Sequence, residues 1–417
     1  FSEAAGSPGM PALIAGEGNP APGTPTGVNY SGVNPPVMNG SGQAAFFAFL
    51  AGAGVDSTNN RGIFSDAAGS PGIPGLVVRA GEAAPGAAPG VNYIGFDSPV
   101  LNGAGQTAFR AFLTGPGVDN SNNTGIFSEA TGSLGAPGLI AREGDAAPDT
   151  PAGVNFNGFA PPAINAAGQT VFRAFLTGAG VDSTNDSAIF SEAAGSTGTP
   201  GLVAREGDAV PGTAPGINFS SFSDPVINGS GQTAFLAGLI GSSVTSLNNS
   251  GIFSEAAGSP GAPGLVARAG DAAPSVPPGV NFRNFGSPTL NDAGQVAFFA
   301  TVTGPGVDFT TDRGVWATTP NGLLTLIIRE GDLFDVDDDP FVDDFRTVST
   351  VNVLGSTGSD DGRPSYFNNA GQLAFRATFA DGSSGIFIAN VIPEPASMSL
   401  VAVSSLTVLL RRRREKA

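Results

Sequence analysis

The residues of this sequence that could do chemistry are carboxylates and arginines. The chain of 417 residues contains no His and no Cys, which excludes thiol nucleophiles, Cys/His zinc sites and every catalytic triad that needs an imidazole. A phrase of the type Arg-Glu-Gly-Asp recurs at Arg79, Arg142, Arg205, Arg268 and Arg329. Paired carboxylates such as Glu143 and Asp145 can act as acid and base in glycosidases. Because a catalytic site is normally single and these groups repeat, we expect the arginines to pair with carboxylates between repeats instead.

A second group of carboxylates lies in an insertion. The interval from Asp332 to Asn368 is 16 residues longer than its counterpart one repeat earlier. Hard carboxylate oxygens at close spacing suit Ca²⁺, so the candidate ligands are Asp335, Asp337 and Asp339. The segment has neither the Gly nor the distal Glu of an EF-hand, and a solvated acidic loop is the alternative. Weaker calcium candidates are the Gly-Val-Asp turns at Asp56, Asp119 and Asp182.

These groups are carried by a sequence that repeats itself. The motif Asn-x-x-Gly-Gln recurs at intervals of 63, 63, 63, 63 and 77 residues, at Asn39, Asn102, Asn165, Asn228, Asn291 and Asn368. An Asn side chain can bond the backbone two residues on, and Gly adopts the left-handed conformation that ends such a turn. The motif therefore predicts a structural hairpin turn in each repeat, in preference to six ligand-binding asparagines.

Each period divides at Gly and Pro clusters into apolar segments that are too short for stable helices, such as 125–129, 138–143, 154–165 and 169–176. We therefore predict an all-β tandem-repeat domain over residues 1–390, arranged as a six-bladed β-propeller. The alternative is an open β-repeat array or solenoid. If a blade runs from the Asn turn to the Arg-Glu phrase, the sixth blade lacks its last strand, which Ala12–Glu17 could supply to close the ring. Since the chain begins inside a repeat and without Met, we expect it to be a fragment.

The turn resembles that of a tandem-repeat family described by the motif Asn-x-x-Gly-x-x-Ala-Phe. Five of the six turns fit this motif, for example Asn39 with Ala45 and Phe46, whereas the turn at Asn165 has Val171 in place of Ala. The resemblance covers nearly all of residues 1–390. It implies an architecture and no activity.

Residues 391–417 form a separate unit. A Pro-Glu-Pro box is followed by the uncharged segment 395–410 and then by an arginine cluster: Pro393, Glu394, Pro395, Arg411, Arg412, Arg413 and Arg414. This arrangement resembles the PEP-CTERM sorting signal in all three parts, with Ile392 where Val is usual. The resemblance implies that an exosortase, a membrane protease-transpeptidase, recognises the box and processes the exported protein.

The physics of the tail agrees with a membrane partner. We expect a short C-terminal hydrophobic helix, although its 16 uncharged residues fall slightly short of the ~20 that span a bilayer. The arginine cluster should stay on the cytoplasmic side. The alternative is a permanent anchor.

Charge narrows the class of function. Residues 1–410 carry 13 positive and 34 negative charges, a net of −21, and therefore repel nucleic acid and anionic lipid. We expect an exported protein of the bacterial cell envelope or extracellular surface, with a non-enzymatic repeat domain that binds or builds structure. Extracellular polysaccharide is the candidate ligand, and Ca²⁺ is the one candidate cofactor. The alternatives are a carboxylate-based polysaccharide hydrolase and a purely structural surface array.

Overall fold

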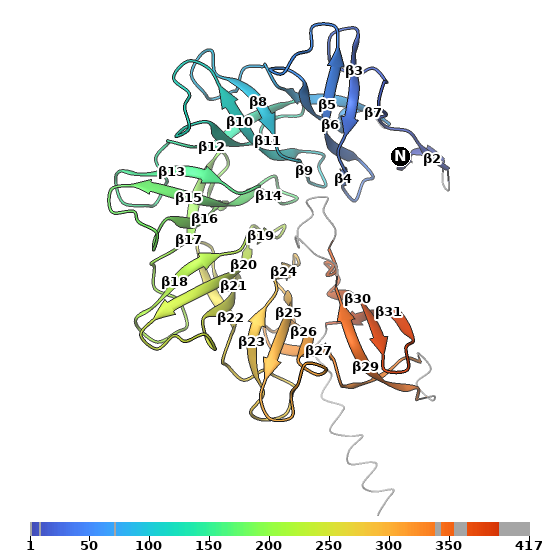
Figure 1. Cartoon of the computed structure of the whole chain (residues 1–417), viewed down its shortest axis with the longest axis vertical. Helices are drawn as coiled ribbons and strands as arrows, with labels where there is room; N and C mark the ends of the chain where they lie inside the picture. Colours follow the sequence, from blue (N-terminus) through green and yellow to red (C-terminus); the bar gives the residue numbers. More distant parts are fainter. Residues whose placement is uncertain (1, 8–9, 71, 338–342, 354–364, 392–417) are drawn as a thin grey trace, which may run out of the picture.

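The computed structural model describes residues 2–7, 10–70, 72–337, 343–353 and 365–391, and these residues form an all-β fold. Six antiparallel sheets fan around a common centre like the blades of a propeller, and the arc stays open between the first sheet and the sixth (Figure 1). The predicted all-β repeat fold is thus confirmed. The described part of the chain contains no helix that is long and apolar enough to cross a membrane, and the predicted C-terminal helix lies outside the described residues.

The first three sheets share one plan. The first sheet contains β3 (Val28–Val33), β4 (Val37–Met38), β5 (Ala44–Gly52), β6 (Arg61–Ser70) and β7 (Ile73–Arg79). The second contains β8 (Asn92–Phe96), β9 (Val100–Leu101), β10 (Thr107–Thr114), β11 (Thr124–Ser133) and β12 (Ala136–Arg142). The third contains β13 (Val154–Phe159), β14 (Ala163–Ile164), β15 (Thr170–Gly178), β16 (Ser187–Ser196) and β17 (Thr199–Arg205).

The fourth and fifth sheets follow the same plan, and the sixth departs from it. The fourth contains β18 (Ile217–Phe222), β19 (Val226–Ile227), β20 (Thr233–Gly241), β21 (Ser250–Ser259) and β22 (Ala262–Arg268). The fifth contains β23 (Asn281–Phe285), β24 (Thr289–Leu290), β25 (Val296–Thr303), β26 (Arg313–Thr318) and β27 (Leu324–Arg329). The sixth contains β28 (Leu333–Asp335), β29 (Phe345–Asn352), β30 (Gln372–Phe379) and β31 (Ser384–Asn390).

The terminal strand exchange that the sequence suggested is not formed. In the structure β2 (Met10–Ala12) pairs with β1 (Ser2–Ser7), and β31 is the edge of its own sheet. The reason is the phase of the repeat, because each sheet begins with a strand that precedes the Asn turn, as β3 does. The insertion therefore falls inside the sixth sheet, where β28 pairs with β29 as the fourth strand.

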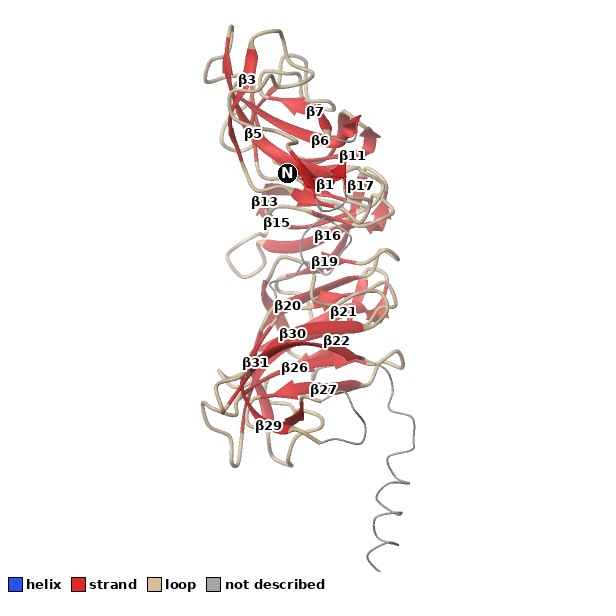
Figure 2. Ribbon diagram, turned by 90° about the vertical axis from the view of Figure 1, so that its right-hand side faces the viewer, coloured by secondary structure: helices blue, strands red, loops and turns tan. Residues whose placement is uncertain are grey.

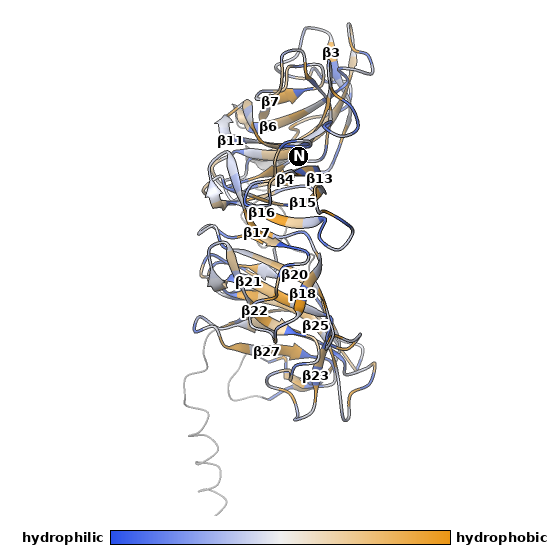
Figure 3. Cartoon of the chain, turned by 90° about the vertical axis from the view of Figure 1, so that its left-hand side faces the viewer, coloured by the Kyte–Doolittle hydropathy of each residue, from blue (hydrophilic) through white to orange (hydrophobic). Residues whose placement is uncertain are grey.

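The hydrophobic core lies between the sheets, which pack face to face along the arc (Figure 2). In the second sheet Phe109 and Phe127 are stacked, with ring centroids 6.1 Å apart, and they belong to one buried cluster with Phe47 and Ile63 of the first sheet. Hydrophobic residues gather in the strands, as expected for sheets covered on both faces (Figure 3). Each sheet therefore depends on its neighbours for burial.

A chain of hydrogen bonds between asparagines, which we call the asparagine ladder, links the six turns. The Asn228 carboxamide oxygen accepts the backbone N–H groups of Ser230 and Gln232 at 3.1 and 2.9 Å, which closes the turn. Its Nδ2 donates to the backbone carbonyl of Asn291 at 2.9 Å. The same donation to the next turn is made by Asn39, Asn102, Asn165 and Asn291, at 2.8–3.2 Å. In the structure the turn asparagines from Asn39 to Asn291 thus bond within their own turn and also join it to the next repeat.

The Gly of the motif is required by the same close approach. Gly105 has φ of 82°, and a Cβ at this position would lie 2.5 Å from the Cβ of Ala67 in the preceding repeat. Any other residue would be strained in its backbone and would also force the two turns apart.

The ladder predicts unequal effects of one substitution at two positions. Asn228→Asp keeps the acceptor that closes the turn, removes the donor to Asn291 and places a charge against that carbonyl group. We expect the free energy of unfolding at pH 7 to fall by about 2–3 kcal/mol, measured by urea denaturation. Asn368→Asp is the matched control, because Asn368 Nδ2 donates only to Gln372 in the described structure. Equal losses in both variants would show that the turn alone, and not the ladder, carries the stability.

Candidate functional site

The arginines of the repeated phrase do not pair with carboxylates between repeats, as the sequence had suggested. Four of them donate Nε to a backbone carbonyl in a loop of their own sheet, at 2.9–3.2 Å: Arg79 to Asn59, Arg142 to Asn122, Arg205 to Asn185 and Arg268 to Asn248. Arg329 pairs with Asp332 at 2.7 Å. The physical reason is that each arginine ends the strand at the sheet edge, beside the loop that enters the neighbouring strand of the same sheet.

One arginine–carboxylate bridge between sheets is made by a different residue. Arg173 of β15 reaches Asp224 in the fourth sheet at 3.1 Å. In the second sheet, Arg110 donates to the backbone carbonyl of Phe159 in the third. Both arginines lie at one position of the long central strand, and their role was not evident from the sequence.

A repeated buried glutamate was also missed by sequence reasoning. Glu129, Glu192 and Glu255 are buried and follow the Gly-Ile-Phe-Ser type of segment with the 63-residue period. Glu129 accepts the Thr107 backbone N–H at 2.8 Å and the Thr107 hydroxyl at 2.7 Å, and it also accepts the Gly135 N–H. Burial raises the pKa of Glu129 and of Glu255. Because backbone N–H groups of neighbouring segments donate to their oxygens, these carboxyls stabilise the packing of adjacent strands within the sheet.

The predicted calcium ligands are only partly described. Asp335 accepts the backbone N–H groups of Asp337 and Asp344 at 3.2 and 3.1 Å, whereas Asp339 lies outside the described residues. The described residues contain no group of three or more carboxylates arranged to hold a metal ion. The calcium site stays a prediction.

The Gly-Val-Asp turns have a structural role. Asp56 accepts the backbone N–H and the hydroxyl of Thr58 at 2.8 and 2.6 Å, and these bonds lower the pKa of Asp56. Asp119 and Asp182 make the same bonds with Ser121 and Thr184. The backbone interpretation of these aspartates accounts for all three.

Two pairs of carboxyl groups lie where the loop before a strand meets the end of the edge strand. They are Asp186 with Glu206 in the third sheet, and Asp312 with Glu330 in the fifth. Burial, together with repulsion from and hydrogen bonding to Asp186, raises the pKa of Glu206 to about 7. Burial also raises the pKa of Glu330, while the Arg313 guanidinium opposes this shift. A carboxyl with a raised pKa is the kind of group that general acid–base chemistry uses near neutral pH.

Glu330 of the fifth-sheet pair lines a hollow at the surface of the protein. This rim hollow, between the fifth and sixth sheets, has a volume of about 650 Å³ and is lined by Phe309, Thr311, Arg313, Glu330, Thr347, Ser349 and Thr350, among others. The Phe309 ring is 86% exposed, and the same loop position holds Ser57, Asn120, Ser183 and Ser246 in the other sheets. An exposed aromatic ring, a cation and several hydroxyls therefore meet at one place.

The corresponding hollow between the first and second sheets has a different lining. It measures about 530 Å³ and is lined by Asn59, Arg79, Glu82 and Tyr93, among others, but Tyr93 is buried. Phe309 is one of the residues that distinguish the two hollows, and it stands at a position where the repeat is broken. Phe309 could have been noticed on that basis, as the one aromatic residue at its loop position.

Comparison with known proteins gives a family and two remote likenesses. The model of a family of unknown function, DUF7453, matches residues 4–133 and 108–399. No curated protein sequence matches the chain. A Trypanosoma rangeli sialidase in complex with sialic acid is 11% identical, with a TM-score of 0.34 over 93% of this chain and 57% of the sialidase. An α-L-arabinanase of Penicillium chrysogenum complexed with arabinobiose is 8% identical, with a TM-score of 0.29 over 85% of this chain and 92% of the arabinanase. Likenesses this remote carry no argument about activity.

The pair Asp186 and Glu206 in the third sheet should make the stability of the fold depend on pH. A carboxyl whose pKa is about 7 in the folded chain, against an ordinary 4.5, binds its proton more tightly when folded. The stability of the fold therefore falls as pH rises from about 4.5 to 7. Glu206→Gln removes this titration, so its melting temperature should rise relative to the parent protein as pH increases from 5 to 8.

The matched control is Glu143→Gln, at the same position of the second sheet. The second sheet has Asn123 where the third sheet has Asp186, so Glu143 has no carboxylate at that position beside it. Glu143 accepts the backbone N–H groups of Asn123 and Thr124, both at 3.1 Å. This variant should be less stable than the parent protein, because the amide weakens those charge-assisted bonds. A constant difference between Glu206→Gln and the parent across the pH range would contradict the assignment.

Proposed function

The chain belongs to the DUF7453 family, and we propose that it is an exported bacterial surface protein, sorted through its C-terminal tail by an exosortase-type protease, whose repeat domain binds extracellular polysaccharide without hydrolysing it. The observation that carries the binding role is the rim hollow around Phe309. The sorting role rests on the tail sequence, whose residues lie outside those that the structure describes.

The rim hollow has the groups that a neutral sugar chain needs. The exposed ring of Phe309 offers an apolar surface on which the face of a pyranose ring can pack. The Arg313 guanidinium, 58% exposed, can donate several hydrogen bonds, and the hydroxyls of Thr347 and Ser349 can donate and accept. A neutral chain fits better than a polyanionic one, because the body of the protein carries a net charge of −21.

The carboxyls of the rim hollow support binding better than hydrolysis. Glycoside hydrolysis uses two carboxyls that flank the scissile bond and both contact the substrate. Glu330 is buried and takes a hydrogen bond from the backbone of Val351, so it stabilises the junction of the fifth and sixth sheets.

The hydrolase alternative has one observation in its favour. The raised pKa of Glu330, which arises from burial, is the property that a general acid requires. Glu330→Gln separates the two functions, because it removes the acid and keeps the shape of the rim hollow.

The binding role is tested by Phe309→Ala. Loss of the exposed ring should weaken binding of a neutral polysaccharide by about tenfold, measured by glycan array and then by calorimetry on the best ligand. The matched control is Ser183→Ala, which changes the same loop position of the third sheet and should leave affinity unchanged. Glu330→Gln should bind as the parent protein does, and neither protein should release reducing ends. Release that the parent shows and Glu330→Gln lacks would establish the hydrolase instead.

The sorting role is tested in a host that has an exosortase. Glu394→Ala should leave export intact and block processing, because one carboxylate hardly alters insertion of the apolar segment. Mass spectrometry of the surface form of the parent protein should show a C-terminus that lacks Arg411–Arg414. An intact C-terminus through Ala417 on the mature parent protein would mean that the tail is a permanent anchor.

A further inference from the structure

The guanidinium group of Arg313 in the rim hollow makes no hydrogen bond to any of the described residues. Its side chain is 58% exposed, and its Nε lies 3.9 Å from a carboxylate oxygen of Asp312. The same strand position holds Arg61 in the first sheet, and Thr or Ser in the second, third and fourth sheets. Arg61 donates a hydrogen bond to the carbonyl group of Ile94 in the next sheet, at 3.0 Å. An arginine at this position can thus join two sheets, and Arg313 does not.

The sixth sheet contains the counterpart of the residue that Arg61 contacts. Ile94 stands where the pairing of β8 with β10 shifts register, and Ser349 stands at the same kind of shift between β29 and β30. No hydrogen bond joins Arg313 to Ser349 in the part of the chain that the structure describes. The five N–H donors of the Arg313 guanidinium are therefore available to a ligand.

The charges around Arg313 favour an uncharged acceptor on that ligand. The carboxyl groups of Asp312 and Glu330 lie near the guanidinium and offset its positive charge. A carboxylate or sulfate group would meet these carboxyls and the net charge of −21 on residues 1–410. A guanidinium has donors and no acceptor, so it pairs with a group that only accepts, and a carbonyl oxygen is the uncharged group of this kind.

The sixth-sheet wall of the rim hollow suits the other half of an amide. Thr347, Ser349 and Thr350 of β29 line this wall, and all three are exposed. Because a hydroxyl oxygen accepts an N–H donor, the hollow offers donors on its fifth-sheet side and acceptors on its sixth-sheet side. An amide carries one acceptor and one donor on a single planar group, and it matches both walls.

A sugar ring that packs on Phe309 would direct its substituents toward these two walls. The Phe309 ring is 86% exposed, and the face of a pyranose can stack on it. Equatorial substituents lie close to the plane of the pyranose, so they project past the edge of the aromatic ring beneath. An acetamido group extends farther from the sugar than a hydroxyl does, and the hollow of about 650 Å³ has room for it.

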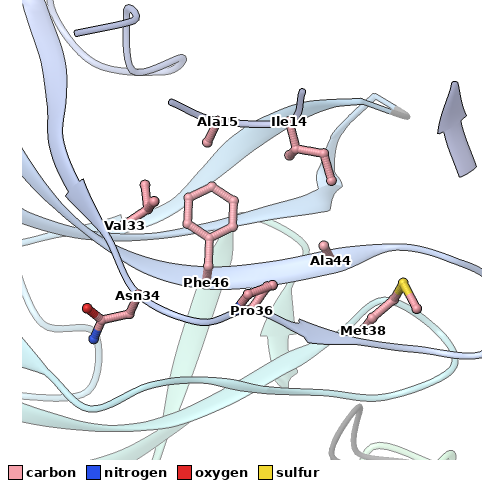
Figure 4. Close-up of a pocket in the computed structure, with 8 residues that line it drawn as sticks. All are labelled: Ile14, Ala15, Val33, Asn34, Pro36, Met38, Ala44 and Phe46. Atoms are coloured by element: carbon pink, nitrogen blue, oxygen red, sulfur yellow. The ribbon is translucent and has the colours of Figure 1, made fainter. Parts of the chain in front are cut away.

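An apolar pocket on the first sheet shows the contrast. It has a volume of about 120 Å³ and is lined by Ile14, Val33, Pro36 and Phe46, among others, with the Phe46 ring directed toward Ile14 (Figure 4). Asn34 is the one polar side chain among its described lining residues. The pocket lacks a group equivalent to Arg313 and a wall of hydroxyls, so it does not suit an amide.

We propose that the rim hollow recognises sugars that carry an N-acetyl group. The acetamido carbonyl accepts hydrogen bonds from Arg313, and the acetamido N–H donates to a hydroxyl of β29. This inference rests on the proposed binding of neutral polysaccharide and names the class of sugar that is bound. Arg313 determines the specificity, whereas Phe309 packs on any pyranose.

The test compares two ligands that differ only in the acetamido group. Chitotetraose and cellotetraose have the same backbone linkage, and chitotetraose has acetamido groups where cellotetraose has hydroxyls. Calorimetry with the full chain should give a Kd for chitotetraose that is about tenfold lower, because a hydrogen bond from a charged donor to a carbonyl is strong. The tetramer of glucosamine, which has ammonium groups in place of the acetamides, should bind more weakly than chitotetraose.

Arg313→Met tests the residue itself, because it removes every donor and keeps a long side chain. The affinity for chitotetraose should fall about tenfold, to that for cellotetraose, while the affinity for cellotetraose changes little. Binding of cellotetraose, together with a circular dichroism melting curve, shows that the variant is folded. Arg61→Met is the matched control at the same position of the first sheet, and it should leave both affinities as in the parent protein.

The outcomes separate this inference from the proposed function. Equal affinities of the parent protein for chitotetraose and cellotetraose would overturn the N-acetyl preference and leave the binding of neutral polysaccharide standing. A glycan array on which only sugars without N-acetyl groups are bound would do the same. A preference that persists in Arg313→Met, or tighter binding of the glucosamine tetramer, would show that Arg313 does not select the ligand. If the parent protein binds no neutral glycan, the proposed function fails and this inference fails with it.

Discussion

The hydrogen bond from each turn asparagine to the carbonyl group of the next sets the spacing of the whole repeat domain. A side-chain amide spans only a short distance, so at the centre of the arc consecutive backbones must lie almost in contact. Farther out, the sheets are separated by the side chains of two faces, and the pairs of aromatic rings need a much wider gap. Sheets that are held close at one end and apart at the other cannot stack in parallel, and the fan follows from this difference.

The same constraint explains which residues the repeat can tolerate. Gly105 is required because the neighbouring Ala67 approaches closer than any Cβ allows, and Ala67 is small for the same reason. Away from the centre the demands relax, and Phe47 of the first sheet is replaced by Arg110 in the second and by Leu236 in the fourth. Phe47 contacts the next sheet through its buried ring, whereas Arg110 contacts it through a hydrogen bond to the Phe159 carbonyl. Stability in such an array is the sum of local contacts between neighbours, so no single sheet is expected to fold alone.

The sequence predicts those features that depend on local backbone chemistry. The turn at each Asn-x-x-Gly, the strand-length apolar segments and the 63-residue period led to an all-β repeat fold. Features that depend on contacts across the fold did not follow. The starting strand of each sheet was misjudged, since nothing local distinguishes the end of one sheet from the start of the next. The arginines of the repeated phrase were expected to pair with carboxylates between repeats, because the Asn59 carbonyl that Arg79 contacts is near it only in the folded sheet.

A repeat protein places its distinguishing chemistry where the repeat is broken. Residues such as Glu129 and Asp56 recur in several sheets, and their oxygens accept hydrogen bonds within the sheet. The Phe309 ring is not needed to form its turn, because the other sheets have serine or asparagine at the same loop position. The exposed Phe309 ring gains little from packing within its own sheet, and burying it against another molecule would be favourable. On the proposed binding role, the Phe309 ring and the rim hollow beside it are the part of the surface where a ligand would bury apolar area.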